Sequence, residues 1–440
     1  MVILIKVVQL LLSLSILVIF HEFGHFLAAR IFKTRVEKFY LFFDPWFSLF
    51  KFKKGDTEYG VGWLPLGGYV KISGMIDESM DKEAMKLPAQ PYEFRAKPSW
   101  QRLIIMLGGV TVNVLLAIGI YVVMLSWWGE QYLPNAEVKY GITVDTLGQK
   151  LGLRNGDKIL TLDHKPVEDF FRIPATIILE DVKTIQVERD NQPIDVVIPR
   201  QLISEIVKHK SPDFISVRIP FEAADFAPGS PAKSAGMQVN DKIIGINGQT
   251  TLYFDEFKAI VQKHKNQKVN VKVLRGVDTV NLAVTVSDRG LIGVAPKTPA
   301  GYFTFKEYHY NILQAIPAGT VKAYEKTADY LKSLKLLFNP EVKAYESVGG
   351  FITIGSIFPS VWDWESFWSL TAFLSLMLAV LNILPIPALD GGHVMFLLYE
   401  IITGRKPSDK FMEYAQITGM VLLFALLIFA NGNDIVKLFR

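Results

Sequence analysis

Four long apolar segments constrain this chain more than any other feature of its sequence. Residues 2–20 carry one charge, Lys6, and at about 1.5 Å per residue they are long enough to cross roughly 28 Å of hydrocarbon. Three more candidates follow, at 103–125, 367–389 and 415–430. Half of the 440 residues are hydrophobic and only 20% are charged, which favours membrane spans over a larger soluble core. Four spans place both termini on the same side.

A removable signal peptide is the alternative interpretation of the first segment. The apolar run continues, however, through His21, Glu22 and His25 to Ala29 without a polar cleavage region, so we expect it to remain as a span. Lysines and arginines are frequent between the first two spans, which predicts a cytoplasmic location for that loop. The long stretch 128–365 then lies on the other face, which is the periplasm if the membrane is a bacterial inner membrane.

Cysteine is absent from the sequence, which limits the chemistry that the chain can perform. Disulfides, thiolate catalysis, iron–sulfur clusters and zinc held by cysteine are all excluded. Any metal must therefore be held by histidine and carboxylate side chains. The net charge of +4 is small and gives no reason to expect nucleic acid as a partner.

An internal repeat occupies the long loop. Residues 152–163 read GLRNGDKILTLD, and residues 236–247 read GMQVNDKIIGIN. Each copy ends in alternating apolar residues and is followed by a helix-like segment and a strand rich in valine and isoleucine. The repeat predicts a duplicated mixed α/β module. The second copy resembles a bacterial PDZ domain, which implies capture of extended peptides at a sheet edge. A spacer or steric filter that binds nothing specific is the alternative.

An amphipathic helix is predicted for 317–338. Val321, Tyr324, Ala328, Leu331 and Leu334 share one face, with lysines between them. Such a helix lies on the membrane surface, packs against another helix or packs against the repeated modules.

The most informative motif is HEFGH at 21–25, an HExxH pattern inside the first span. On a helix, His21 and His25 lie one turn apart on one face, so both imidazoles can reach one zinc ion with Glu22 beside it. Ionisable groups are costly inside a span and mark a functional site there. A polar cluster that only holds helices together is the alternative.

A catalytic zinc normally has three protein ligands, and the third must come from elsewhere in the chain. Asp390 is the first candidate, in the sequence NILPIPALDGGH at 382–393, where two prolines and two glycines must interrupt the third span. His393 is a competing ligand, ranked second because its direction after the Gly-Gly pair is uncertain.

The motifs HEFGH at 21–25 and NILPIPALDGGH at 382–393, with a PDZ pair between them, resemble the site-2 protease family of intramembrane zinc metalloproteases. The likeness covers essentially the whole chain. The resemblance implies one zinc per chain, held by His21, His25 and Asp390, with Glu22 as the base that activates water. It also implies substrate-binding positions at Asn382, Pro385, Pro387 and Asn113. The glycine-rich stretch GVGWLPLGGYV at 60–70, with Gly62, Gly67 and Gly68, matches the family's membrane-reentrant β-structure, whose edge would pair with an unwound substrate. An ordinary β-hairpin is the alternative there.

The sequence departs from the family pattern at two places. Val110 and Phe351 stand where the family commonly has proline. Both positions affect helix geometry and substrate gating rather than the zinc ligands.

The predicted fold is a polytopic α-helical membrane protein with about four transmembrane helices, a membrane-associated β-structure and two α/β PDZ domains inserted between spans two and three. The segments are a first transmembrane helix (1–32), a cytoplasmic loop with the reentrant β-structure (33–100), a second transmembrane helix (101–127), PDZ domain 1 (128–212), PDZ domain 2 (213–300), amphipathic connecting helices (301–365), a third transmembrane segment (366–400), a cytoplasmic loop (401–414) and a fourth transmembrane helix (415–440).

The function implied by the resemblance is a zinc endopeptidase that cuts single-span membrane proteins within the bilayer. The expected substrate is an anti-sigma factor already trimmed by another protease, in an envelope stress response, and leftover signal peptides are a related class. A non-catalytic membrane scaffold with peptide-binding PDZ modules is the main alternative. A transporter or channel with ion sites at a broken helix is a second one.

Overall fold

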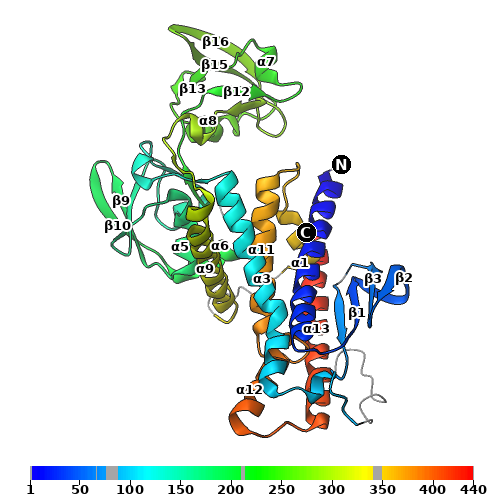
Figure 1. Cartoon of the computed structure of the whole chain (residues 1–440). Coiled ribbons are helices and arrows are strands. Elements are labelled where there is room, and N and C mark those ends of the chain that lie inside the picture. Colours follow the sequence, from blue (N-terminus) through cyan, green and yellow to red (C-terminus); the bar gives the residue numbers. More distant parts are fainter. Residues whose placement is uncertain (1, 66, 76–87, 210–213, 340–348, 440) are drawn as a thin grey trace. The chain divides into compact units, whose positions relative to one another are not determined.

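The computed structural model describes residues 2–65, 67–75, 88–209, 214–339 and 349–439 (Figure 1). Parts of the predicted cytoplasmic loop (76–87) and of the predicted connecting helices (340–348) lie outside the described residues. The chain divides into two compact units. The first comprises Met1–Gly129, His309–Leu331 and Val348–Arg440, and the second comprises Glu130–Tyr308 and Lys332–Ser347.

Four helices of the first unit are long and apolar enough to cross a membrane, which confirms the four predicted spans. They are α1 (Val2–Ile31), α3 (Ser99–Trp127), α11 (Trp364–Ile383) and α13 (Asp409–Leu438). The third span ends earlier than predicted because Pro385 and Pro387 cannot continue the helix. A new helix, α12 (Asp390–Thr403), begins after them.

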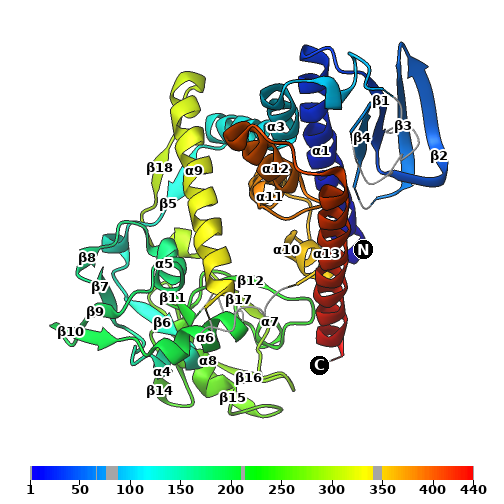
Figure 2. The ribbon, with the colours of Figure 1, turned by 90° about the horizontal axis from the view of Figure 1, so that it is seen from below.

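The spans α1, α3 and α11 lie side by side in both ribbon views (Figures 1 and 2). The backbones of α1 and α3 touch, because a Cβ atom on Gly24 would lie 2.2 Å from the carbonyl oxygen of Gly108. Hydrogen bonds between hydroxyl groups add to this packing. Thr371 on α11 donates to Ser13 on α1 over 3.0 Å. Small residues and buried hydroxyls of this kind hold helices together in a membrane.

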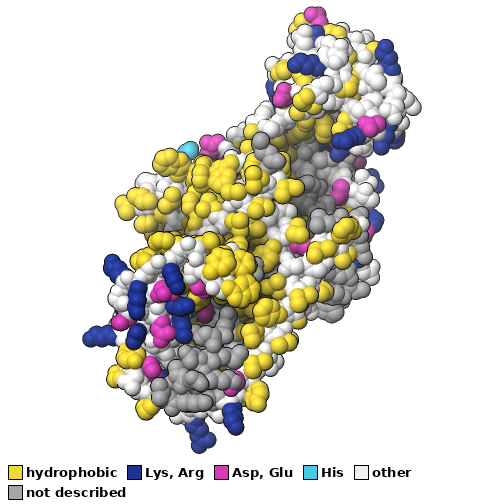
Figure 3. All heavy atoms as spheres, turned by 90° about the vertical axis from the view of Figure 1, so that its right-hand side faces the viewer, with side chains coloured by type: hydrophobic (Ala, Val, Ile, Leu, Met, Phe, Trp, Pro, Cys, Tyr) yellow, Lys and Arg dark blue, Asp and Glu magenta, His cyan; other side chains and the backbone are white. Residues whose placement is uncertain are grey.

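Hydrophobic side chains gather on the outer face of the first unit over the spans, with lysine and arginine side chains beside them (Figure 3). On α13, the exposed apolar residues include Leu422, Phe424, Leu426 and Ile428. An outward band of this kind is what a lipid-facing helix presents.

A four-stranded sheet follows α1 in the chain. It consists of β1 (Val36–Leu41), β2 (Phe43–Lys54), β3 (Thr57–Leu64) and β4 (Tyr69–Ile72) in the order β2-β3-β1-β4. Strand β1 pairs parallel with β3 and antiparallel with β4. Within the described residues, β4 is therefore an edge strand. Aromatic residues are exposed on β2, with Trp46 at 90% exposure.

Helix α9 (Ile312–Leu337) corresponds to the predicted amphipathic helix, but it begins before Pro317 and turns a different face inward. The buried residues are Ala315, Gly319 and Ala323. Gly319 packs so closely on α3 that a Cβ atom would lie 2.8 Å from a methyl group of Val122. The predicted apolar face is largely exposed, because close helix contact selects small side chains rather than large ones.

The second unit contains two β modules of the same topology, which agrees with the predicted duplication. In chain order the first has β7 (Lys158–Leu162), β8 (Lys165–Pro166), α5 (Ile173–Leu179), β9 (Thr184–Arg189) and β10 (Gln192–Val197). The second has β13 (Lys242–Ile246), β14 (Gln249–Thr250), α8 (Phe254–Val261), β15 (Lys268–Arg275) and β16 (Asp278–Thr285). In both sheets the first strand of the module lies between the second and the third.

Shorter elements complete the two units. They are β5 (Glu130–Tyr132), β6 (Ile142–Val144), α4 (Thr146–Lys150), α6 (Arg200–His209), β11 (Ile215–Val217), β12 (Ala223–Phe226), α7 (Pro231–Ser234), β17 (Val294–Pro296), β18 (Lys306–Tyr308) and α10 (Phe351–Ile357). Each module has its own hydrophobic core.

The residues shared by the two repeats form the same clamp in both modules. In the second, Asp241 accepts two hydrogen bonds from Arg275, over 2.8 and 2.7 Å, and Arg275 also donates to the carbonyl of Gly236 over 2.8 Å. In the first, Arg189 makes the corresponding bonds to Asp157 and to the carbonyl of Gly152. A bidentate ion pair thus closes the turn before the first strand of each module.

We expect the clamp to make the stability of the second module depend on pH. Burial alone would raise the pKa of the Asp241 carboxyl, but hydrogen bonds from Arg275 and from the amide of Gln238 outweigh it, and the pKa lies below its ordinary value. The stabilisation is therefore present above about pH 4 and is lost as the pH falls through the lowered pKa. Asp241→Asn should lower the unfolding temperature at pH 7 and weaken its acid dependence.

Differential scanning calorimetry of the full-length protein in detergent at pH 7, and at pH values falling from 4 to about 2, measures this effect. Asp278→Asn, at an exposed position of the same module, is the matched control. Equal unfolding temperatures for the two variants at pH 7 would contradict the prediction.

Candidate metal centre

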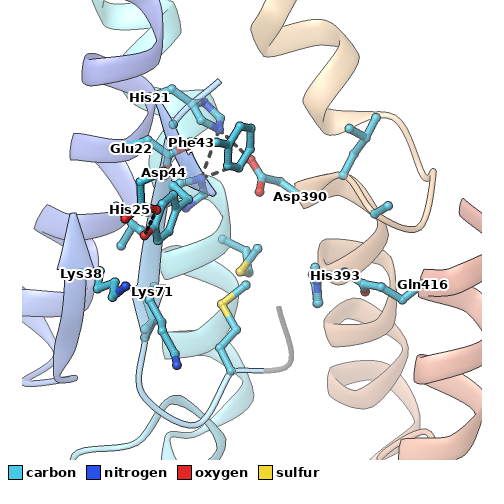
Figure 4. Close-up of a pocket in the computed structure, with 18 of the residues that line it drawn as sticks. His21, Glu22, His25, Lys38, Phe43, Asp44, Lys71, Asp390, His393 and Gln416 are labelled. Carbon is cyan, nitrogen blue, oxygen red and sulfur yellow. Dashed lines mark hydrogen bonds and ion pairs between the residues drawn. The ribbon is translucent and has the colours of Figure 1, made fainter. Parts of the chain in front are cut away.

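Three elements of the first unit meet at the HExxH motif. His21, Glu22 and His25 lie on α1, Asp390 is the first residue of α12, and α3 packs behind the two imidazoles. Both histidines are buried because they are on the face of α1 that packs into the unit. Their rings meet edge to face with centroids 4.9 Å apart. Figure 4 shows both side chains directed toward Asp390.

The potential ligand atoms form a compact triangle. The Nε2 atoms of His21 and His25 are 3.3 Å apart. The Oδ2 atom of Asp390 lies 3.3 Å from the Nε2 atom of His21 and 3.2 Å from that of His25. Within the described ranges, this is the one cluster of histidine and carboxylate ligands with such spacing.

The geometry fits a zinc ion. A tetrahedral ion with bonds of about 2.0–2.1 Å separates any two of its ligand atoms by about 3.3 Å, which matches all three observed distances. The Oδ2 atom of Asp390 is also buried and makes no well-aligned hydrogen bond to the part of the chain that the structure describes. A buried carboxylate oxygen in this situation calls for a cation.

The loop between α11 and α12 positions Asp390. Ala388 has a left-handed backbone conformation, with φ +82°. A Cβ atom on Gly391 would lie 2.1 Å from the carbonyl oxygen of Leu384, and one on Gly392 would lie 2.7 Å from the Cα atom of Pro387. The two glycines after Asp390 are therefore required for the loop to fold back on the first turn of α12.

Helix α3 supports the imidazoles from behind. The Nδ1 atom of His25 lies 2.9 Å from the carbonyl oxygen of Ile105, and that of His21 lies 3.2 Å from the Nδ2 atom of Asn113. Gly109 makes room for both rings, since a Cβ atom there would lie 2.4 Å from His25 and 2.6 Å from His21. The roles of Ile105 and Gly109 were not predicted from the sequence, in which the Gly108-Gly109 pair was the available signal.

His393, the competing ligand, is not part of the cluster. It lines the same cavity farther along α12, beside Gln416 of α13 (Figure 4). The structure therefore favours Asp390 as the third ligand.

A cavity of about 650 Å³ opens beside the cluster. Glu22 lines it, together with strand β4 and the start of α12. Gly68 brings the sheet against α1, because a Cβ atom there would lie 2.6 Å from a methyl group of Val18 and 3.5 Å from the Cγ atom of Glu22.

The predicted substrate-binding residues lie at different places around this cavity. Gly68 lines it, whereas Gly62, on strand β3, and Gly67, between β3 and β4, are not among the residues that line it. The Nδ2 atom of Asn382 lies 3.3 Å from the Nε2 atom of His21. Pro385 and Pro387 shape the loop before Asp390, and Asn113 is buried behind His21. Their roles in substrate binding stay predictions.

Comparison with known proteins decides the family. The sequence profile of peptidase family M50 matches residues 9–426. The chain belongs to peptidase family M50. This membership confirms the predicted resemblance to intramembrane zinc metalloproteases. It also argues against the non-catalytic scaffold and the transporter.

Named M50 relatives match over nearly their full length. The regulator of sigma E protease from Haemophilus influenzae is 26% identical, with 97% of this chain and 98% of that protein covered. Protease RseP from Yersinia pestis is 27% identical with the same coverage. A protein from Rickettsia conorii that carries a zinc metalloprotease name is 27% identical over 99% of each chain. This M50 chain is therefore a membrane zinc metalloprotease.

We expect Asp390→Asn to reduce the zinc affinity by more than about 100-fold, because groups that only support metal ligands already contribute about 10- to 100-fold. His393→Ala, on the same helix and in the same cavity, should keep about one zinc per chain. Mass spectrometry of metals bound to the purified protein measures both. Full zinc occupancy in Asp390→Asn, or loss of zinc in His393→Ala, would contradict the assignment.

Proposed function

We propose that this chain is an endopeptidase that cleaves single-span membrane proteins within or near the bilayer. The observation that carries the proposal is the cluster of His21, His25 and Asp390 between spans, with Glu22 and an open cavity beside it. Three protein ligands leave the fourth position of a tetrahedral ion available, as in catalytic zinc sites.

The chemistry divides between the ion and Glu22. Zinc, when bound by His21, His25 and Asp390, lowers the pKa of water toward neutrality and polarises the scissile carbonyl. Glu22 follows the first ligand directly in the chain and lines the cavity. It accepts the proton of the attacking water and passes it to the leaving amide nitrogen.

The sheet supplies a place for an extended substrate. Tyr69, Val70, Lys71 and Ile72, which make up the edge strand β4, all line the cavity. A substrate segment that has unwound from its helix can add to this edge through backbone hydrogen bonds. Gly62, Gly67 and Gly68 would shape this sheet, with Pro385 and Pro387 shaping the loop opposite. Asn382 would hold the substrate backbone next to the ion.

The two β modules act as PDZ domains in this proposal and face the periplasm of a bacterial inner membrane. A second cavity, of about 470 Å³, supports peptide binding by the second module. It lies between strand β17 and helix α8, and its walls include Phe226, Phe257 and Ile292. The pair would admit trimmed substrates and exclude bulky ectodomains. Relatives named regulator of sigma E protease support a trimmed anti-sigma factor as substrate, and remnant signal peptides would fit the same site.

Glu22→Gln should keep the zinc and lower the cleavage rate by about 10²- to 10⁴-fold, because the amide cannot accept the proton. The assay follows cleavage of a tagged single-span substrate that lacks its ectodomain. Glu365→Gln, at an exposed position in the first turn of α11, is the matched control and should cleave normally. Normal cleavage by Glu22→Gln would remove Glu22 from the mechanism.

A folded ectodomain on the substrate should suppress cleavage if the modules filter by size. We expect the same single-span segment to be cut efficiently without the ectodomain and at least about 10-fold more slowly with it, which corresponds to about 1.4 kcal/mol in the barrier. Zinc content is unchanged in this comparison, so the two rates report on access alone. Equal rates would exclude the filter while leaving the catalytic site in place.

A further inference from the structure

Asn113 on α3 has an unusual environment for an amide. It is 0% exposed, and its Nδ2 atom lies 3.2 Å from the Nδ1 atom of His21. Its Oδ1 atom is buried and has no hydrogen-bond partner within the described residues. Its backbone carbonyl accepts a hydrogen bond from Ser375 on α11 over 2.8 Å. The backbone at Asn113 is therefore tied to α11, and the buried side chain has one unused acceptor.

The tautomer of His21 gives this acceptor a partner. Since the Nε2 atom of His21 points into the triangle of ligand atoms, the hydrogen of a neutral imidazole must be on Nδ1. An amide nitrogen opposite that N–H would place two donors against each other. Rotation of the Asn113 amide by half a turn exchanges nitrogen for oxygen at nearly the same shape. The N–H of His21 then donates to Oδ1, and both groups are satisfied.

The neighbouring histidine shows the same arrangement. The Nδ1 atom of His25 lies 2.9 Å from the carbonyl oxygen of Ile105. Ile105 and Asn113 are eight residues apart, slightly more than two turns, so they lie on the same face of α3. Gly109 is midway between them and lets both rings approach. Helix α3 thus offers one acceptor behind each imidazole.

We propose that Asn113 is a positioning residue that holds His21, through its Oδ1 atom, in the tautomer and orientation needed for zinc. This inference rests on the proposed ligand set of His21, His25 and Asp390. Acceptors behind metal-bound histidines fix the ring and raise its basicity. The complete burial of Asn113 leaves no side-chain surface for a substrate, so its effect on cleavage passes through His21.

Zinc affinity tests the proposal independently of activity. Asn113→Leu replaces the amide with an apolar side chain of similar size, and Asn113→Asp keeps an acceptor at the same place. Competition with a chromophoric chelator, on the full-length protein in detergent, should show zinc affinity about 10- to 100-fold weaker for Asn113→Leu. Asn113→Asp should recover most of it. Thr111→Val, at an exposed position of α3, is the matched control.

A second variant and a kinetic readout keep the test decisive. Asn113→Ala removes the acceptor without adding apolar bulk, and it replaces Asn113→Leu if that variant does not fold. Unchanged zinc affinity in the folded variants overturns the proposal. A raised KM at saturating zinc, with unchanged zinc affinity, assigns Asn113 to substrate binding instead. Absence of zinc from the wild type would overturn the ligand set itself, which distinguishes the two failures.

Discussion

The contact between the backbones of α1 and α3 at Gly24 and Gly108 is the constraint on which the membrane part of the structure depends. Polar ligands are expensive among apolar helices unless each has a partner. Direct backbone contact brings α3 close enough to supply those partners to His21 and His25. A larger residue at either glycine would separate the helices and leave both imidazoles unsupported.

The remaining parts of the site come from elements that the spans hold against this pair. The loop after α11 returns Asp390 to the histidines, and the sheet reaches α1 at Gly68, beside Glu22. The cavity therefore has a charged, ligand-bearing wall and a wall made by the edge strand β4. In the proposed function, chemistry and substrate alignment belong to different elements, so the sheet can change its sequence without disturbing the ligand atoms.

The sequence predicted those features of the site that depend on residues close together in the chain. The spacing of His21 and His25 follows from helix geometry, and the prolines before Asp390 predicted the break in the third span. Contacts between residues far apart in the chain were harder to predict. The burial of Gly319 on α9 depends on how closely α3 approaches. The spacing from Asp to Arg differs between the two clamps, so Arg189 and Arg275 were not recognised as partners of the repeated Asp. Similarly, the proximity of Asn113 to His21 requires the packing of two helices, since the two residues are 92 positions apart in sequence.

The twin Asp–Arg clamps also bear on how far the sequences of the two β modules can differ. Each clamp joins a buried carboxylate to one guanidinium and a backbone carbonyl, so it fixes the turn with few side-chain identities. Exposed positions outside the clamp and the hydrophobic core of each module are less constrained. One framework therefore tolerates two sequences with unrelated binding surfaces, so that one module can hold a ligand while the other keeps only its shape.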